Sequence, residues 1–184
     1  TISQIERKKG IKRTIQYRPD GNDFVCVNGK NRYTRALYGG ITDFRIETSD
    51  RPVFAAYKPK DSKHICFRLQ CGNQSIALDS LKFCEARYRA GRRTYRLTDP
   101  LLGKGELNIS VLAFPDAEGG IWRFTMKDMP EGALLHCYIS EIRAKNLSRN
   151  GDMGADRADS FDAPQLPKEQ KHYKLSLDGT TAYI

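Results

Sequence analysis

Short alternations of apolar and polar residues recur along the chain and indicate β-strands. Residues 83–89 show this most clearly, because Ala86 and Tyr88 alternate with Glu85 and Arg87 and would lie on opposite faces of a sheet. Apolar positions at helical spacing are absent from every window of 12 or more residues. The pattern therefore predicts a chain of strands rather than helices.

Turn signals divide the predicted strands into hairpins. Asn28-Gly29 predicts a hairpin between residues 24–28 and 31–37, since glycine tolerates a positive φ. Gly91 predicts another hairpin directly after residues 83–89. The other predicted strands are residues 11–17, 44–48, 53–57, 65–71, 75–78, 93–97, 106–114, 121–127, 134–142, 172–177 and 181–184.

The spacing of these strands predicts the fold class. About a dozen short strands at intervals of roughly 8–12 residues are typical of a large antiparallel β-sandwich. A chain of 184 residues fits a single domain of this kind, residues 1–184. Residues 143–170 lose the strand pattern and gather Asn, Gly, Asp and Pro, so we expect a long irregular loop there.

Composition narrows the classes of protein further. No apolar run reaches the ~20 residues that a membrane-spanning helix needs, so we expect no membrane span. The five cysteines form no C-x-x-C pair and the three histidines are scattered, so we expect neither a metal nor a cofactor. Most of these cysteines should be small buried hydrophobes, and an oxidising compartment would leave room for one disulfide. Nucleophile, phosphate-binding and dinucleotide-binding motifs are absent, so no residue is assigned as catalytic.

Positive charge is concentrated in one half of the chain. Residues 1–100 hold 21 basic and 10 acidic side chains, whereas residues 101–184 hold 10 and 12. A basic hairpin contributes to this excess with Arg87, Arg89, Arg92, Arg93 and Arg96, interleaved with Tyr88 and Tyr95. Two interpretations stand: a site for an anionic polymer, or a solvated charged face above core tyrosines.

The predicted loop contains the only acidic cluster, with Asp152, Asp156 and Asp159 close together. Three interpretations stand for it: polar residues of a solvated loop, a calcium site, or a contact to a sugar or a neighbouring domain. The spacing does not match the calcium-binding loop of an EF-hand.

Four stretches carry a resemblance to a known family. They are residues 17–24 (YRPDGNDF), 28–40 (NGKNRYTRALYGG), 50–55 (DRPVFA) and 149–154 (RNGDMG). In this order they resemble the N-terminal β-sandwich domain of an uncharacterised family of gut Bacteroidetes proteins related to six-hairpin (α/α)6 glycosidases. The resemblance implies a galactose-mutarotase-like supersandwich that precedes a C-terminal helical toroid in a longer, exported protein. It also implies a periplasmic or cell-surface location and a role in carbohydrate metabolism.

Three hypotheses about function follow. In the first, the chain is the non-catalytic scaffold of a glycoside hydrolase-like protein. It would then shape a carbohydrate cleft through Arg32, Tyr33, Arg35, Tyr38 and the loop with Asp152 and Asp156. In the second, it is a free-standing module that binds an anionic polysaccharide or nucleic acid through the basic hairpin. In the third, it is a mutarotase-type enzyme that uses His136 or His172 with a carboxylate.

Overall fold

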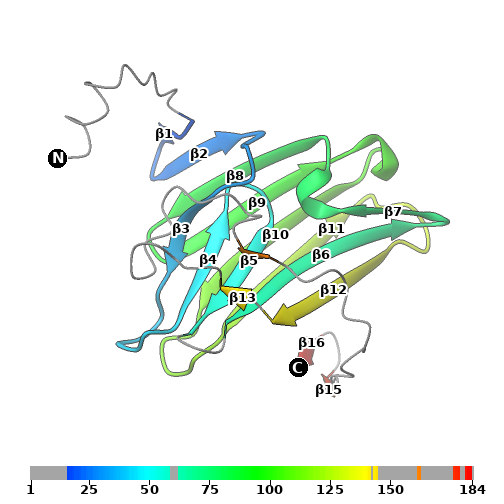
Figure 1. The fold of residues 1–184 in the computed structure, drawn as a ribbon. Coiled ribbons are helices and arrows are strands. Elements are labelled where there is room, and N and C mark those ends of the chain that lie inside the picture. Colours follow the sequence, from blue (N-terminus) through cyan, green and yellow to red (C-terminus); the bar gives the residue numbers. More distant parts are fainter. Residues whose placement is uncertain are drawn as a thin grey trace.

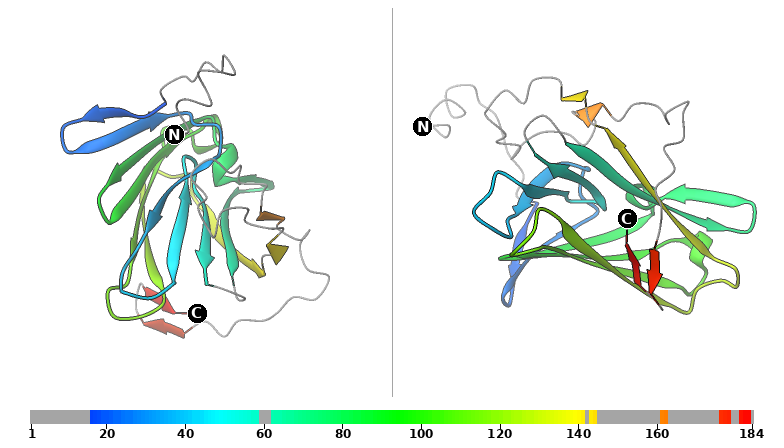
Figure 2. Two further views of the ribbon diagram at one scale, coloured as in Figure 1. Left: turned by 60° about the vertical axis from the view of Figure 1, so that its left-hand side comes forward. Right: turned by 90° about the horizontal axis from the view of Figure 1, so that it is seen from below.

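The computed structural model describes residues 16–58 and 62–141, together with four short strands nearer the C-terminus. In these described residues the backbone forms β-strands and two short 3-10 helices, Leu78–Ser80 and Pro100–Leu102, and no α-helix. Twelve strands form two antiparallel sheets that pack face to face (Figures 1 and 2). The prediction of a large antiparallel β-sandwich of about a dozen strands is confirmed.

The first sheet, called sheet 1, contains the predicted basic hairpin. Its strand order is β1-β2-β8-β9-β10-β11, and all neighbours are antiparallel. The strands are β1 (Arg18–Asp20), β2 (Asp23–Val27), β8 (Phe83–Arg89), β9 (Arg92–Thr98), β10 (Glu106–Ala113) and β11 (Gly120–Lys127). Gly91 has a φ of 77° in the turn between β8 and β9, as its predicted role requires.

The second sheet, called sheet 2, has the order β12-β6-β5-β4-β3, with β7 paired to the end of β6. The strands are β3 (Tyr33–Leu37), β4 (Arg45–Ser49), β5 (Val53–Tyr57), β6 (Lys63–Cys71), β7 (Gln74–Ala77) and β12 (Leu134–Glu141). Two further pairs of short strands follow: β13 (Arg143–Ala144) with β14 (Phe161–Asp162), and β15 (Ser176–Asp178) with β16 (Thr181–Tyr183). Apart from β13 and β14, the predicted loop at residues 143–170 lies outside the described residues.

Aromatic rings join the two sheets in the core. Phe54 on β5 is fully buried, and its ring meets those of Tyr95 and Trp122 from sheet 1 edge-on, at centroid distances of 5.7 and 5.8 Å. Phe67 on β6 meets Phe124 on β11 at 4.8 Å. Edge-to-face packing of this kind adds about 0.5–1.5 kcal/mol per pair to the burial of the rings. Trp122 is therefore partly buried and packs against the core.

The predicted hairpin across Asn28-Gly29 is wrong. The strand before it, β2, pairs with β8 in sheet 1, whereas the strand after it, β3, pairs with β4 in sheet 2. Asn28 continues the pairing to β8, because its N–H donates to the carbonyl of Cys84 at 2.8 Å. The chain therefore crosses from one sheet to the other at this point instead of reversing on itself.

Asp50 and Arg51 hold this crossing in place. The Asp50 carboxylate accepts hydrogen bonds from the backbone N–H groups of Lys30 and Arg32, at 3.1 and 2.7 Å. The Arg51 guanidinium donates to the carbonyl of Gly29 at 2.9 Å, and also reaches the carbonyls of Asp79 and Leu81. Two of the sequence stretches noted above, 28–40 and 50–55, thus meet in space and share a structural role.

The described residues contain no helix with the length and apolar character that crossing a membrane requires.

Candidate functional site

The outer face of sheet 1 carries rows of polar side chains. Tyr95 on β9 and Ile109 on β10 are buried in the core, so their strand neighbours point outward. The strand pairing places Thr94 opposite Ser110, and Ser110 opposite Arg123 on β11. Outward-facing residues from three strands therefore form one continuous row.

A second row lies beside the first on the same face. It consists, in strand order, of Glu85, Arg96, Asn108 and Thr125. Asn108 donates to Glu106 at 2.7 Å, which fixes the direction of its amide. Hydroxyls and an amide thus occupy the middle of the face, and arginines stand on both sides of them.

These rows line an open groove with a volume of about 430 Å³. The short side chains of Thr94, Ser110 and Asn108 lie between longer arginine side chains, which accounts for the depression. The lining residues are Glu85, Arg87, Arg92, Thr94, Tyr95, Arg96, Asn108, Ile109, Ser110, Arg123 and Thr125. All of them belong to four adjacent strands, β8 to β11, whose pairing fixes their spacing.

Three of the arginines on this face are paired with carboxylates. Arg87 contacts Asp20 at 2.9 Å and Glu85 at 2.8 Å, and Arg89 contacts Asp23 at 2.7 Å. The third, Arg96, reaches Glu106 at 3.4 Å and Glu85 at 3.6 Å. The predicted basic hairpin is therefore neutralised over much of its length, and it is not an uninterrupted surface for a polyanion.

Hydrogen bonds favour the ionised form of two carboxylates of this network. The Arg89 guanidinium beside Asp23 lowers the pKa of that carboxyl below its ordinary value. The hydrogen bond from Asn108 lowers the pKa of Glu106 in the same way. The face of sheet 1 around the groove consequently presents fixed negative as well as positive groups near neutral pH.

Two arginines of the groove remain without such partners. Arg92 and Arg123 are exposed, and no hydrogen bond or ion pair ties either of them to another residue in the described part of the chain. Arg92 comes from the turn end of β9, and Arg123 comes from the edge strand β11. Their guanidinium groups are the positive charges of the groove that are available to a ligand.

Comparison with known proteins places this groove within a family. Residues 59–181, which are 123 of the 184 residues, match the domain of unknown function DUF4450. The chain belongs to the DUF4450 family. No curated protein and no solved structure matches the chain. Every lining residue of the groove falls inside the range that matches DUF4450, whereas β1 to β5 precede it.

The DUF4450 structure places Arg93 away from the groove. This residue of the predicted basic site is fully buried between the sheets, with 0% of its surface exposed. Its guanidinium donates to the carbonyl of Ser49 at 2.8 Å and to the hydroxyls of Tyr95 and Tyr17. Arg93 therefore cannot contact a ligand from solvent, and its role is to connect the sheets.

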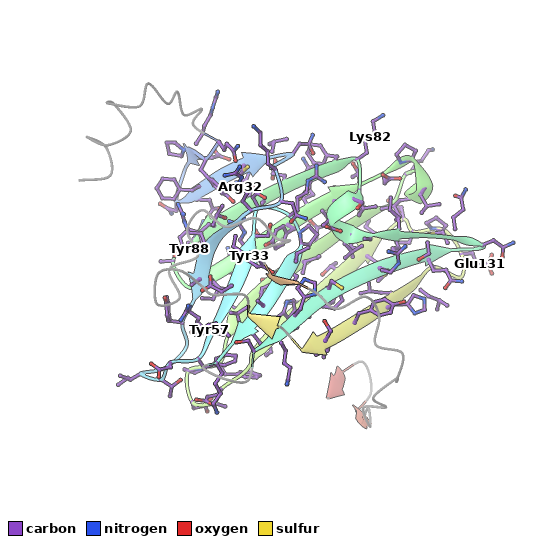
Figure 3. The ribbon with its side chains drawn as sticks, viewed as in Figure 1. Arg32, Tyr33, Tyr57, Lys82, Tyr88 and Glu131 are labelled. Carbon is purple, nitrogen blue, oxygen red and sulfur yellow. The ribbon has the colours of Figure 1, made fainter. Side chains whose placement is uncertain are left out.

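The residues predicted on β3 do not join the groove either, because β3 belongs to sheet 2. Tyr33 is fully buried, which excludes a ligand contact from solvent (Figure 3). The backbone N–H of Arg32 is held by Asp50, and the Arg35 guanidinium lies over the rings of Tyr17 and Tyr88, at 5.4 and 5.2 Å.

Tyr38 is 63% exposed and lies on the connection from β3 to β4. Of the residues predicted on and after β3, Tyr38 thus remains open to a partner. Among the described residues, no hydrogen bond, ion pair or ring contact joins Tyr38 to an arginine of sheet 1.

The remaining predicted residues give no site in the described structure. Asp152, Asp156 and His172 lie outside the described residues. His136 on β12 forms a hydrogen bond to the amide oxygen of Gln70 at 2.9 Å. Within the described part of the DUF4450 chain, no group of three or more His, Cys, Asp or Glu side chains is arranged to hold a metal ion.

Sequence reasoning missed half of the groove. Asn108, Ser110, Arg123 and Thr125 were not singled out, although they alternate with apolar residues that are buried along β10 and partly buried along β11. That alternation, together with the six-residue connection at 114–119, would have paired Ser110 with Arg123. Pairing of β9 with β10 would then have placed both beside the basic hairpin.

Proposed function

We propose that this DUF4450 domain is a non-catalytic part of a glycoside hydrolase-like protein and contacts carbohydrate through the groove of sheet 1. The observation that carries the proposal is the groove's mixture of groups. Sugar hydroxyls both donate and accept hydrogen bonds. Asn108, Ser110 and Thr94 can do both, and the arginine–carboxylate pairs beside them add fixed donors and acceptors.

The state of the carboxylates supports a non-catalytic role. Glycoside hydrolysis needs one carboxyl group that holds a proton near neutral pH, which requires a raised pKa. Glu106 has the opposite shift, and Glu85 is engaged by both Arg87 and Arg96. These groups suit binding and orientation of a polar ligand better than proton transfer.

Resemblance of the four sequence stretches supports the wider setting of the proposal. In that setting the domain packs against a C-terminal helical toroid of the same protein, and the toroid supplies the catalytic acid. The protein would act in the periplasm or at the cell surface, where it would encounter polysaccharides. The antiparallel sandwich observed in the structure is compatible with this arrangement.

Binding to immobilised polysaccharides tests the proposal directly. Affinity electrophoresis through gels containing neutral or acidic plant and host polysaccharides should show retardation by at least one of them. Ser110→Trp places a large ring in the middle of the groove and should abolish the retardation, because strands tolerate an outward-facing aromatic residue. Gln74→Trp on the exposed strand β7 is the matched control. Equal retardation of the two variants, or no retardation by any polysaccharide, would overturn the proposal.

A further inference from the structure

Two arginines from different strands, Arg92 and Arg123, line the groove on sheet 1. Arg123 on β11 lies opposite Ser110 on β10. On the other side of β10, Arg93 on β9 lies opposite Val111, the residue after Ser110, and Arg92 directly precedes Arg93. Standard strand spacing puts the Cα atoms of Arg92 and Arg123 on the order of 12 Å apart on the same face. Both side chains line the same groove. Two extended arginine side chains can converge on a group of a few atoms across this distance.

An anionic group would satisfy this pair. A guanidinium binds a carboxylate or a sulfate through two parallel hydrogen bonds, and such bonds are roughly twice as strong as neutral ones. Arg87 and Arg96, the other arginines of the groove, and the neighbouring Arg89 have carboxylates within 2.7–3.4 Å, whereas Arg92 and Arg123 have none in the described part of the chain. Two positive groups that line one groove without an anion between them are therefore its distinctive chemical feature.

The surroundings of the pair point to a sugar as the carrier of the anion. The hydroxyls of Thr94 and Ser110 lie in the row of Arg123, and the amide of Asn108 lies one row further from Arg92. The row of Arg92 itself contains the exposed apolar residues Leu112 and Ile121. A ring with several hydroxyls beside its carboxylate or sulfate matches this set, because each hydroxyl needs a partner that donates or accepts.

Nucleic acid fits the groove less well. Single strands are held by bases that stack on exposed aromatic rings. The only aromatic residue in the lining is Tyr95, and its ring is buried in the core.

We propose that the sheet 1 groove binds an acidic polysaccharide, with Arg92 and Arg123 holding the anionic group of a sugar and Thr94, Ser110 and Asn108 holding neighbouring hydroxyls. This inference rests on the proposed carbohydrate-contacting function and narrows its ligand class. The anionic group is a carboxylate, as in a uronic acid, or a sulfate. Affinity then depends on these two arginines and falls as salt screens them.

Titration calorimetry with four probes tests the inference on the intact chain. The probes are oligogalacturonate, the same oligosaccharide after reduction of its carboxyl groups to neutral alcohols, a carrageenan oligosaccharide whose anionic groups are all sulfates, and single-stranded DNA. We expect binding to at least one of the two acidic oligosaccharides and at least a tenfold weaker affinity for the neutral product. Comparison of oligogalacturonate with the sulfated probe then identifies the anionic group as carboxylate or sulfate.

Substitutions assign the binding to the two arginines. Arg123→Ala and Arg92→Ala should each lower the affinity for the acidic oligosaccharide about tenfold, and the double variant should lower it about a hundredfold. Arg123→Lys should recover only part of the loss, since an ammonium lacks the two-pronged geometry. Lys82→Ala is the matched control, because Lys82 is exposed, does not line the groove and projects from the periphery of the molecule (Figure 3). Circular dichroism and thermal melting should show all variants folded.

The outcomes separate this inference from the function on which it rests. Equal affinity for the neutral and acidic oligosaccharides, unaffected by the arginine substitutions, would overturn the inference that the ligand is acidic. The proposed contact with carbohydrate would remain supported. No binding of either acidic oligosaccharide, or binding of DNA alone, would overturn the inference, and the carbohydrate contact would fall with it only if no polysaccharide in the gels retards the chain. Equal losses in Lys82→Ala and Arg123→Ala would show attraction to net charge and would also overturn the inference.

Discussion

The guanidinium of Arg93 on β9 donates a hydrogen bond to the backbone carbonyl of Ser49 on β4, across the interface between the two sheets, at 2.8 Å. The hydroxyl of Tyr95 donates to the same oxygen at 2.6 Å and accepts from Arg93 at 3.2 Å. Burial raises the pKa of Tyr95, so this hydroxyl keeps its proton. Arg93 has no carboxylate partner among the described residues, and its Nη1 atom makes no hydrogen bond there.

The loss of stability on substitution of Arg93 should therefore depend more on the volume of the new side chain than on its charge. Arg93→Ala should lower the free energy of unfolding by about 3 kcal/mol, because it leaves a cavity between the sheets. Arg93→Met fills most of that space and removes a buried charge, so its cost should be about 1 kcal/mol. Urea unfolding followed by circular dichroism measures both values.

The neighbouring Arg92 supplies the control for this prediction. Arg92→Ala, at an exposed position on the same strand, should change the free energy of unfolding by less than about 0.5 kcal/mol. Equal stability of Arg93→Ala and Arg92→Ala would contradict the role of Arg93 in joining the sheets.

Gly29 and Asp50 should be energetically coupled. A Cβ atom at Gly29 would lie 2.7 Å from the Cβ of Asp50, so Gly29→Ala should cost about 2 kcal/mol through overpacking. Asp50→Ala removes the acceptor of two backbone N–H groups and should itself cost about 2 kcal/mol. In the double variant the clashes with Cγ and Oδ2 of Asp50 are gone and the clash with Cβ remains, so part of the overpacking is relieved and the total cost should be smaller than the sum. Strictly additive losses in urea unfolding would contradict this account.

Local signals in the sequence predicted most strands, because a strand and its turn are encoded by adjacent residues. The strand at 83–89 coincides with β8, and Gly91 gives the turn to β9. The crossing after β2 could not be predicted in the same way. It depends on Asp50, about twenty positions further along the chain, which captures the backbone that Asn28-Gly29 would otherwise have turned into a hairpin.

The groove was predictable only in part, for a related reason. The basic hairpin was visible in the sequence, but which of its arginines are free depends on partners from other strands. Asp20 on β1 neutralises Arg87, and Glu106 on β10 contacts Arg96. To predict the part of the groove near Arg123, the strand order β9-β10-β11 within sheet 1 would have to be known. Partner choice between distant strands is set by the tertiary fold and is not encoded locally.

The cysteines of the core should be unreactive in the folded protein. All the cysteines in the structure are free thiols, and Cys26 and Cys84 are buried. Burial raises the pKa of Cys84 to about 12, so its reactive thiolate is present at only about one part in ten thousand at pH 8. We expect a disulfide reagent to modify both thiols only after unfolding in urea.

Serine variants make this prediction specific. The double variant Cys26→Ser/Cys84→Ser should show the same number of rapidly reacting thiols as the wild type under native conditions, and two fewer in urea. Mass spectrometry of the labelled peptides locates the modified residues. Rapid native labelling of Cys84 would show that the core opens more readily than its packing implies.

Carboxylates of the sheet 1 network should make the protein sensitive to acid. The Arg89 guanidinium lowers the pKa of Asp23 below its ordinary value of 3.8, and Asn108 lowers that of Glu106 below 4.5. A group whose pKa is lower in the folded state stabilises that state fully above its unfolded pKa. This stabilisation is lost as the pH falls through the folded pKa. The melting temperature should therefore be steady near neutral pH and fall progressively below about pH 4.5.

Neutral variants of these carboxylates test the assignment. Asp23→Asn and Glu106→Gln should each melt at a lower temperature than the wild type at pH 7, and the two curves should converge as the pH falls, because the protonated wild type has lost the same interaction. Asp116→Asn, in the exposed connection between β10 and β11, should follow the wild-type curve at every pH. Melting curves recorded by circular dichroism at several pH values give the comparison. A constant difference between Asp23→Asn and the wild type down to about pH 2 would show that the ionised Asp23–Arg89 pair contributes nothing to the acid sensitivity.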